Sequence, residues 1–163
     1  MKSLNEHLQV YLKQLKKGDI KIAYQGLMNF LNDLRIHFKN NHPDFSVAGN
    51  IYQGQMDISF FNCSPPSFKK EKLKIVILFM HETLQFDIWL CGANKQIQKK
   101  YWEIFKESDW DKYRIPTTTK NVFSIVEHTI VEQANFDDLA KLTLQIDNEA
   151  MKFITVIKND LLL

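Results

Sequence analysis

The stretch that most constrains the fold is residues 73–91, LKIVILFMHETLQFDIWLC. Its first eight residues are almost all apolar, so both faces of a strand would be covered, and we expect a central strand of a sheet. A turn centred on Glu82-Thr83 leads into a second alternating run, which predicts a β-hairpin. On the core face the hairpin pairs Phe79 with Phe86, Ile77 with Ile88, and Ile75 with Leu90. The face opposite the core face is partly polar, because the second strand places Asp87 and Trp89 there.

Another hairpin is predicted upstream, in SVAGNIYQGQMDISFF. Apolar and polar residues alternate there, and Gly54 suits the positive φ of a tight turn at Gln53-Gly54. A two-residue turn places Asn50 opposite Asp57 and Ile51 opposite Met56. The predicted core face holds Val47, Ile51, Met56, Ile58 and Phe60. The predicted polar face holds Ser46, Asn50, Tyr52, Gln55, Asp57 and Ser59.

Helical periodicity precedes the sheet. Leucines recur at helical spacing over residues 4–15, and Gly18 is a good stop signal. Asp19 can cap a second helix whose apolar face runs from Ile22 to Phe38. Because the link between the two helices is short, we expect them to form a helical hairpin.

The last third of the chain adds two helices and one ambiguous segment. A helix is predicted from Lys95 to about Glu107, after an N-cap at Asn94. Residues 122–132 fit a strand or a helix, and their β-branched side chains favour a strand. From Asp137 a further helix carries a narrow apolar seam that suits packing along another helix. An intramolecular neighbour is the preferred partner of this seam, and a homodimer is the alternative.

Length and composition limit the number of domains and the class of partner. At 163 residues the chain can bury a core large enough for one domain without a metal or a disulfide staple. We therefore expect a single α+β domain over residues 1–163, with an N-terminal helical hairpin, an antiparallel sheet of four or five strands, and helices packed on it. The net charge of +2 is too small to indicate nucleic acid as the main partner.

The first residues and the two cysteines indicate the cellular compartment of the protein. The start of the chain is charged and lacks the apolar core of a signal peptide. No apolar run approaches the ~20 residues that a membrane span needs, so we expect no membrane partner. Cys63 and Cys91 do not make a disulfide framework, and we expect both to be free thiols in a cytoplasmic protein.

Sequence motifs identify no activity. The chain has no CxxC, HExxH, Walker-type, GxSxG or glycine-rich dinucleotide motif. His37 and His42 are separated by a helix end and a proline, a poor geometry for a shared zinc ion, and we expect neither a metal nor a cofactor. The leading hypothesis is a non-catalytic module that binds a small ligand or a protein on a polar sheet face. Its candidate binding residues are Asn50, Tyr52, Asp57, Asp87 and Trp89.

The alternative hypothesis is a divergent metal-dependent nuclease. The order of elements is similar to that of restriction-endonuclease-like cores, in which carboxylates on adjoining strands hold Mg²⁺. Asp57 and Asp87 both point away from the predicted core faces, and this hypothesis requires them to converge within ~5 Å. The characteristic acid-x-Lys triplet is absent, because Asp87 is followed by Ile88 and Trp89.

Three segments together resemble a known family: GNIYQGQMDISFF, LKIVILFMHETLQFDIWLCGANKQIQKKY and SIVEHTIVEQANFDDL. The family is a group of small bacterial proteins known only as a domain of unknown function. The likeness extends from LKKGDIKIAY to the last helix. It implies one complete domain and supplies no catalytic residues.

Overall fold

Five strands form one sheet in the order in which they occur in the chain, each antiparallel to its neighbours. The computed structural model describes residues 1–163. The strands are β1 (Ser46–Val47), β2 (Ile58–Ser64), β3 (Leu73–Met80), β4 (Gln85–Gly92) and β5 (Ser124–Val131). The helices are α1 (Leu4–Lys17), α2 (Asp19–Asn41), α3 (Pro66–Lys70), α4 (Lys95–Glu107) and α5 (Leu139–Asp160). These elements confirm the predicted α+β fold.

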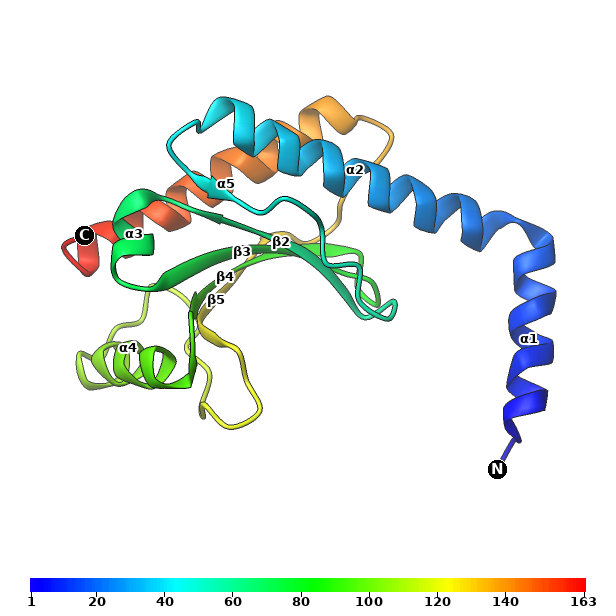
Figure 1. The fold of residues 1–163 in the computed structure, drawn as a ribbon, viewed down its shortest axis with the longest axis horizontal. Helices are drawn as coiled ribbons and strands as arrows, with labels where there is room; N and C mark the ends of the chain where they lie inside the picture. The colour runs from blue at the N-terminus through cyan, green and yellow to red at the C-terminus, as the bar shows by residue number, and fades with distance from the viewer.

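The main core lies between the sheet and two helices, α2 and α5, that cover the same face of it (Figure 1). α5 buries one stripe of side chains, and this stripe includes most of the seam that the sequence predicts. An intramolecular neighbour therefore occupies the seam, as expected. The buried residues of α5 are Leu142, Ile146, Ala150, Phe153, Ile154 and Ile157.

The β3–β4 hairpin confirms the predicted register. Ile77 pairs with Ile88 and lies fully buried, while the flanking pairs also match the prediction. β3 is buried along most of its length and has β2 and β4 on either side, so it is a central strand. Residues 124–131 form a strand, which settles the ambiguous segment in favour of the preferred interpretation.

The two N-terminal helices are present, but they do not lie side by side. α1 and α2 meet at Gly18, and α1 then projects away from the rest of the molecule (Figure 1). α1 buries no residue. The expected hairpin packing is therefore replaced by an elbow, because a short link also permits two helices to diverge.

The predicted register of the first hairpin is wrong. β1 pairs Ser46 with Ser64, and an isolated bridge joins Tyr52 to Phe60. A longer turn replaces the expected two-residue turn. Gly54 has the expected positive φ of 67°, and Met56 also has a positive φ, of 64°. A side chain at Gly54 would collide with the carbonyl oxygen of Ile58, so this turn requires glycine.

This longer turn reverses the two faces of β2. Ser59 and Phe61 are buried on the core side, whereas Ile58 and Phe60 pack on the opposite side of the sheet. The sequence-based assignment had placed Ile58 and Phe60 on the core face. A shift of one residue moves every side chain of a strand to the other face.

A polar clasp ties the C-terminal end of α2 to α5. The Nε2 atoms of His37 and His42 lie 2.6 Å and 2.8 Å from the two carboxylate oxygens of Asp147. The sequence predicts a poor geometry for a zinc ion shared by the two histidines, because the helix ends near them at a proline. In the structure both rings reach one carboxylate, because His42 caps the end of α2. The carboxylate bridges the two rings, and no group of three or more His, Cys, Asp or Glu side chains could hold a metal ion.

Candidate functional site

The sheet face opposite α2 and α5, here called the open face, is covered over only part of its area. The connection from α4 to β5, residues 108–123, contacts β5. Arg114 pairs with Glu127 through the backbone, and its guanidinium forms an ion pair with the same residue at 3.0 Å. Gln98 of α4 donates hydrogen bonds to the carbonyl oxygens of Val122 and Ser124. These contacts hold α4 and the connection at the β5 side of the sheet.

A groove of about 710 Å³ occupies the uncovered part of the open face. Its floor is apolar and comes from three neighbouring strands. Phe60 of β2, Val76 and Leu78 of β3, and Trp89 and Cys91 of β4 form this floor. We call this feature the open-face groove.

The two rims of the groove are built from residues outside the strands. Tyr52 stacks on Phe60 with ring centroids 4.7 Å apart and forms one rim. The first turn of α4 and the exposed ring of Phe123 form the other rim. Gly92 lets the end of β4 approach α4, because a Cβ atom there would lie 2.5 Å from the backbone nitrogen of Gln98.

Trp89 lines the groove and contains a buried hydrogen-bond donor that lacks a partner. Its indole Nε1 is buried and forms no hydrogen bond, although the residue as a whole is half-buried. The other two tryptophans differ: Trp102 donates to the carbonyl oxygen of Pro116 at 2.7 Å, and Trp110 donates to Asp160 at 2.6 Å. Leaving a buried donor unpaired costs about 1–3 kcal/mol, so an acceptor placed at Trp89 would be stabilised.

Charged side chains lie around the groove rather than on its floor. Lys74 is exposed and lines the groove next to Cys91. Asp57 lines the groove near the turn, where hydrogen bonds from the backbone N–H groups of Gln55 and Ile58 hold the pKa of its carboxyl group below the usual value. Lys95 donates to the carbonyl oxygens of Thr119 and Val122, so its charge is already used to fix the connection.

The cysteines do not provide a nucleophile. Both are free and buried. Burial raises the pKa of the Cys91 thiol to about 12, with a smaller opposing effect from Lys74, so the thiol stays protonated at neutral pH. Burial also raises the pKa of Cys63, which lies in the main core.

The structure brings three of the five predicted binding residues together. Tyr52, Asp57 and Trp89 all line the open-face groove. Asn50 is exposed and does not line it. Asp87 lies on the open side of the sheet but is only 9% exposed, and its carboxylate accepts a hydrogen bond from Gln85.

The two carboxylates of the nuclease hypothesis do not form a common site. Asp57 precedes β2, and Asp87 lies on β4 opposite Leu78, which itself pairs with Phe60. Two strand spacings and three residues along the strand therefore separate Asp57 from Asp87, which places their Cα atoms about 14 Å apart. This distance is far greater than the ~5 Å that a shared metal ion requires.

Sequence reasoning missed most of the groove floor. The sequence pattern places Phe60 on the core face and indicates no role for Val76 and Leu78 beyond an apolar strand. An apolar face on β3 opposite the core face was the available signal. Whether such a face is covered by a helix or lines a groove depends on where the helices pack, and the periodicity of a single strand does not show this.

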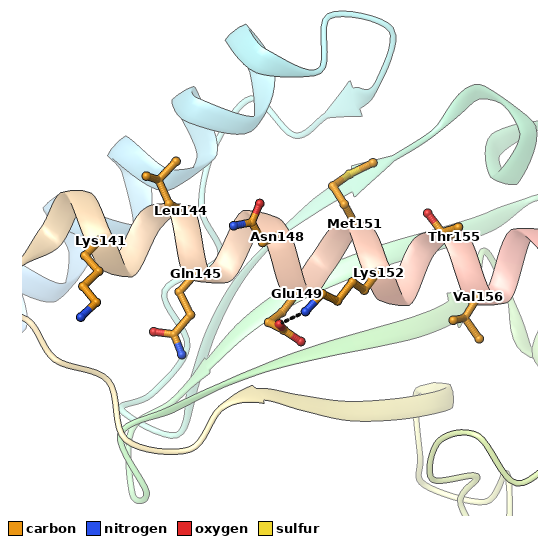
Figure 2. Close-up of a pocket in the computed structure, with 9 residues that line it drawn as sticks. All are labelled: Lys141, Leu144, Gln145, Asn148, Glu149, Met151, Lys152, Thr155 and Val156. Atoms are coloured by element: carbon orange, nitrogen blue, oxygen red, sulfur yellow. Dashed lines mark hydrogen bonds and ion pairs between the residues drawn. The ribbon is translucent and has the colours of Figure 1, made fainter.

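A second concave region follows the outer surface of α5 and contains no converging groups. The side chains that line it, among them Leu144, Gln145 and Thr155, all come from this one helix (Figure 2). The ion pair between Glu149 and Lys152, at 2.6 Å, joins neighbouring turns of the helix. We therefore regard the open-face groove as the candidate functional site.

Comparison with protein families gives one match. The model of the domain of unknown function DUF7000 matches residues 4–161. The chain belongs to this family. The match runs from α1 to the end of α5, so the open-face groove of this DUF7000 member lies entirely within the family domain. No curated protein and no solved structure matches the chain. None of its helices has both the length and the apolar character needed to cross a bilayer.

Proposed function

We propose that this DUF7000 protein is a non-catalytic binding module whose open-face groove takes a small ligand with a flat apolar body and one anionic or carbonyl acceptor. The observation that carries this proposal is a groove with an apolar floor in which Trp89 has an indole N–H without an acceptor. Because this N–H is buried, the indole ring must shift slightly for a ligand to reach it. An acceptor on the ligand would complete this hydrogen bond. The apolar body would cover Phe60, Val76 and Leu78.

The dimensions of the groove support a small molecule rather than a protein segment. Its volume of about 710 Å³ lies in the range of 300–1,000 Å³ that is typical of small-molecule sites. Such sites are mostly apolar and have a few polar groups that orient the ligand. Here Asn62, Lys74 and Trp89 are available for orientation, since Lys95 and Gln98 already bond within the protein.

The charges around the groove favour an anionic acceptor. Lys74 provides a cation at the rim, and the first turn of α4 adds the positive end of a helix dipole. Asp57 lies at the turn that precedes β2, on the same side of the groove as Tyr52. We propose binding rather than catalysis because the groove floor consists mainly of apolar side chains and the Cys91 thiol on it is protonated.

We also propose that the module works in the cytoplasm. Its two cysteines are free thiols on opposite sides of the sheet. Unpaired thiols of this kind suit a reducing compartment.

The test is a fluorescence titration with 8-anilinonaphthalene-1-sulfonate, which combines aromatic rings with an anionic acceptor. The change Trp89→Phe keeps the apolar surface and removes the donor, so affinity should fall roughly tenfold. Lys74→Glu should also weaken binding, and the effect should shrink at high salt. The control is Lys99→Glu, an exposed position on α4 that does not line the groove. Unchanged affinity in both groove variants would contradict the proposal.

A further inference from the structure

Helix α1 exposes an apolar stripe that nothing in the chain covers. None of its residues is buried, and it projects away from the sheet and from α2 (Figure 1). Leu4 is 74% exposed and Tyr11 is 60% exposed. A stable helix of 14 residues with an uncovered apolar face is typical of a surface that meets a partner.

The stripe has the spacing of a helix-pairing seam. Leu4, Leu8, Tyr11 and Leu15 follow one another at intervals of four, three and four residues. The positions that flank this seam hold no Asp, Glu, Lys or Arg: they are Asn5, His7, Leu12 and Gln14. The charged residues of α1 lie on the other side of the helix: Glu6, Lys13, Lys16 and Lys17.

The seam is also symmetric about its own centre. When the helix is reversed, Leu4 takes the place of Leu15, and Leu8 takes the place of Tyr11. Two copies of α1 that run antiparallel would therefore place apolar residues opposite one another in every layer. An interface between two copies about a two-fold axis requires such a self-complementary surface, whereas binding of an unrelated partner does not require it.

We infer that α1 pairs with α1 of a second copy of this chain, antiparallel, about a two-fold axis between Leu8 and Tyr11. Fourteen residues give a helix about 21 Å long, so this pairing would bury about 700 Å² over the two copies. This area belongs to the small, reversible class of interfaces, and the dimer should depend on protein concentration.

Sedimentation equilibrium of the full chain between about 10 and 500 μM tests the pairing. The wild type should shift from monomer to dimer across this range. Leu8→Glu should abolish the shift and leave the thermal unfolding midpoint unchanged, because α1 contributes nothing to the protomer's core. The control is Lys13→Glu on the charged side of α1, which should still form dimers.

Disulfide cross-linking tests the direction of the pairing. Leu4 and its symmetry mate would lie about 16 Å apart in the antiparallel arrangement, too far for a disulfide, whereas Leu4 and the second copy's Leu15 would be adjacent. Leu4→Cys combined with Leu15→Cys should therefore give a linked dimer, and Leu4→Cys alone should not. The native cysteines are buried and should not interfere.

Two outcomes would overturn the inference. One is a wild type that stays monomeric throughout the concentration range. If α1 of that monomer instead bound vesicles of anionic lipid, the apolar stripe would be a membrane-binding surface and not a dimer interface. The other is a disulfide-linked dimer of Leu4→Cys alone, which would show a parallel arrangement.

Discussion

At the scale of single residues, Asp147 has an unusual structural role. Its carboxylate holds two imidazole rings and so fixes the end of α2 against α5. Asn41 donates from its side-chain amide to Nδ1 of His37, so the Nε2 of that ring carries the proton that Asp147 accepts.

We expect Asp147→Ala to lower the free energy of unfolding by about 1–3 kcal/mol, because it leaves two partly buried rings without their acceptor. Urea denaturation at neutral pH measures the change. The matched control is Glu149→Ala on the same helix, where the carboxylate pairs only with an exposed lysine. That change should cost less than about 0.5 kcal/mol. Equal losses in the two variants would show that Asp147 is not a clasp.

His128 makes the stability of the protein depend on pH. Burial between the rings of Tyr113 and Phe153 lowers its pKa, and the carboxylates of Glu149 and Asp87 oppose this effect. The unfolded state then binds the proton more readily than the folded state. Stability should therefore fall as the pH drops below about 6.5, and continue to fall until the pH reaches the folded-state pKa.

The change His128→Phe keeps the ring stack and removes the titrating group, so it should flatten the fall in stability between about pH 7 and pH 5. His81 contributes in the same range because burial lowers its pKa too. Asp57 acts in a separate, more acidic range, since its pKa lies below the usual 3.8. Thermal unfolding of both proteins across these pH values is the measurement. An identical slope in the variant would rule out His128 as a cause.

At the scale of elements, the β3–β4 hairpin is the most securely specified part of the chain. Ile77 and Ile88 face each other in the core, while Asp87 points to the open side. We expect Ile88→Ala to cost about 2–5 kcal/mol of stability, and Asp87→Ala to cost less. Urea denaturation distinguishes the two. A larger loss for Asp87→Ala would mean that the faces of β4 have been assigned the wrong way round.

The contrast between the two hairpins shows what sequence periodicity can determine. In β3 and β4 the apolar runs are long, and a wrong register would expose many large side chains, so the pattern fixes the pairing. In the first hairpin the turn includes a positive φ at Met56, a residue type that gives no signal for this conformation. The predicted turn was therefore too short, and the faces of β2 were reversed.

The candidate site was predictable to the same extent as the strands that form it. Trp89 was identified because the β4 register was right. Asp57 was predicted on the polar face of a strand, but it reaches the groove from the longer turn that precedes β2. Phe60 was missed because its strand was assigned the wrong face. The position of α1 was also not predictable, since the spacing of its leucines indicates an apolar stripe without showing what covers it.

At the scale of the whole molecule, the open face explains why β3 is apolar on both sides. α2 and α5 cover one side, and on the other side the apolar residues of β3 pack with Phe60, Trp89 and Cys91. The apolar residues Val76 and Leu78 are then left to form the floor of a groove. A ligand in that groove would complete the second layer over the sheet.

The most direct test of this account is the indole N–H spectrum of the ¹⁵N-labelled protein, titrated with 2-naphthoate. Three indole signals are expected, and those of Trp102 and Trp110 serve as internal controls because both already donate hydrogen bonds within the protein. The account predicts a saturable downfield shift of the Trp89 signal alone, because the carboxylate accepts a hydrogen bond from the indole N–H. It also predicts a smaller response to the neutral analogue 2-naphthalenemethanol. A Trp89 signal that stays in place while the carboxylate binds elsewhere, or does not bind, would contradict the proposed function.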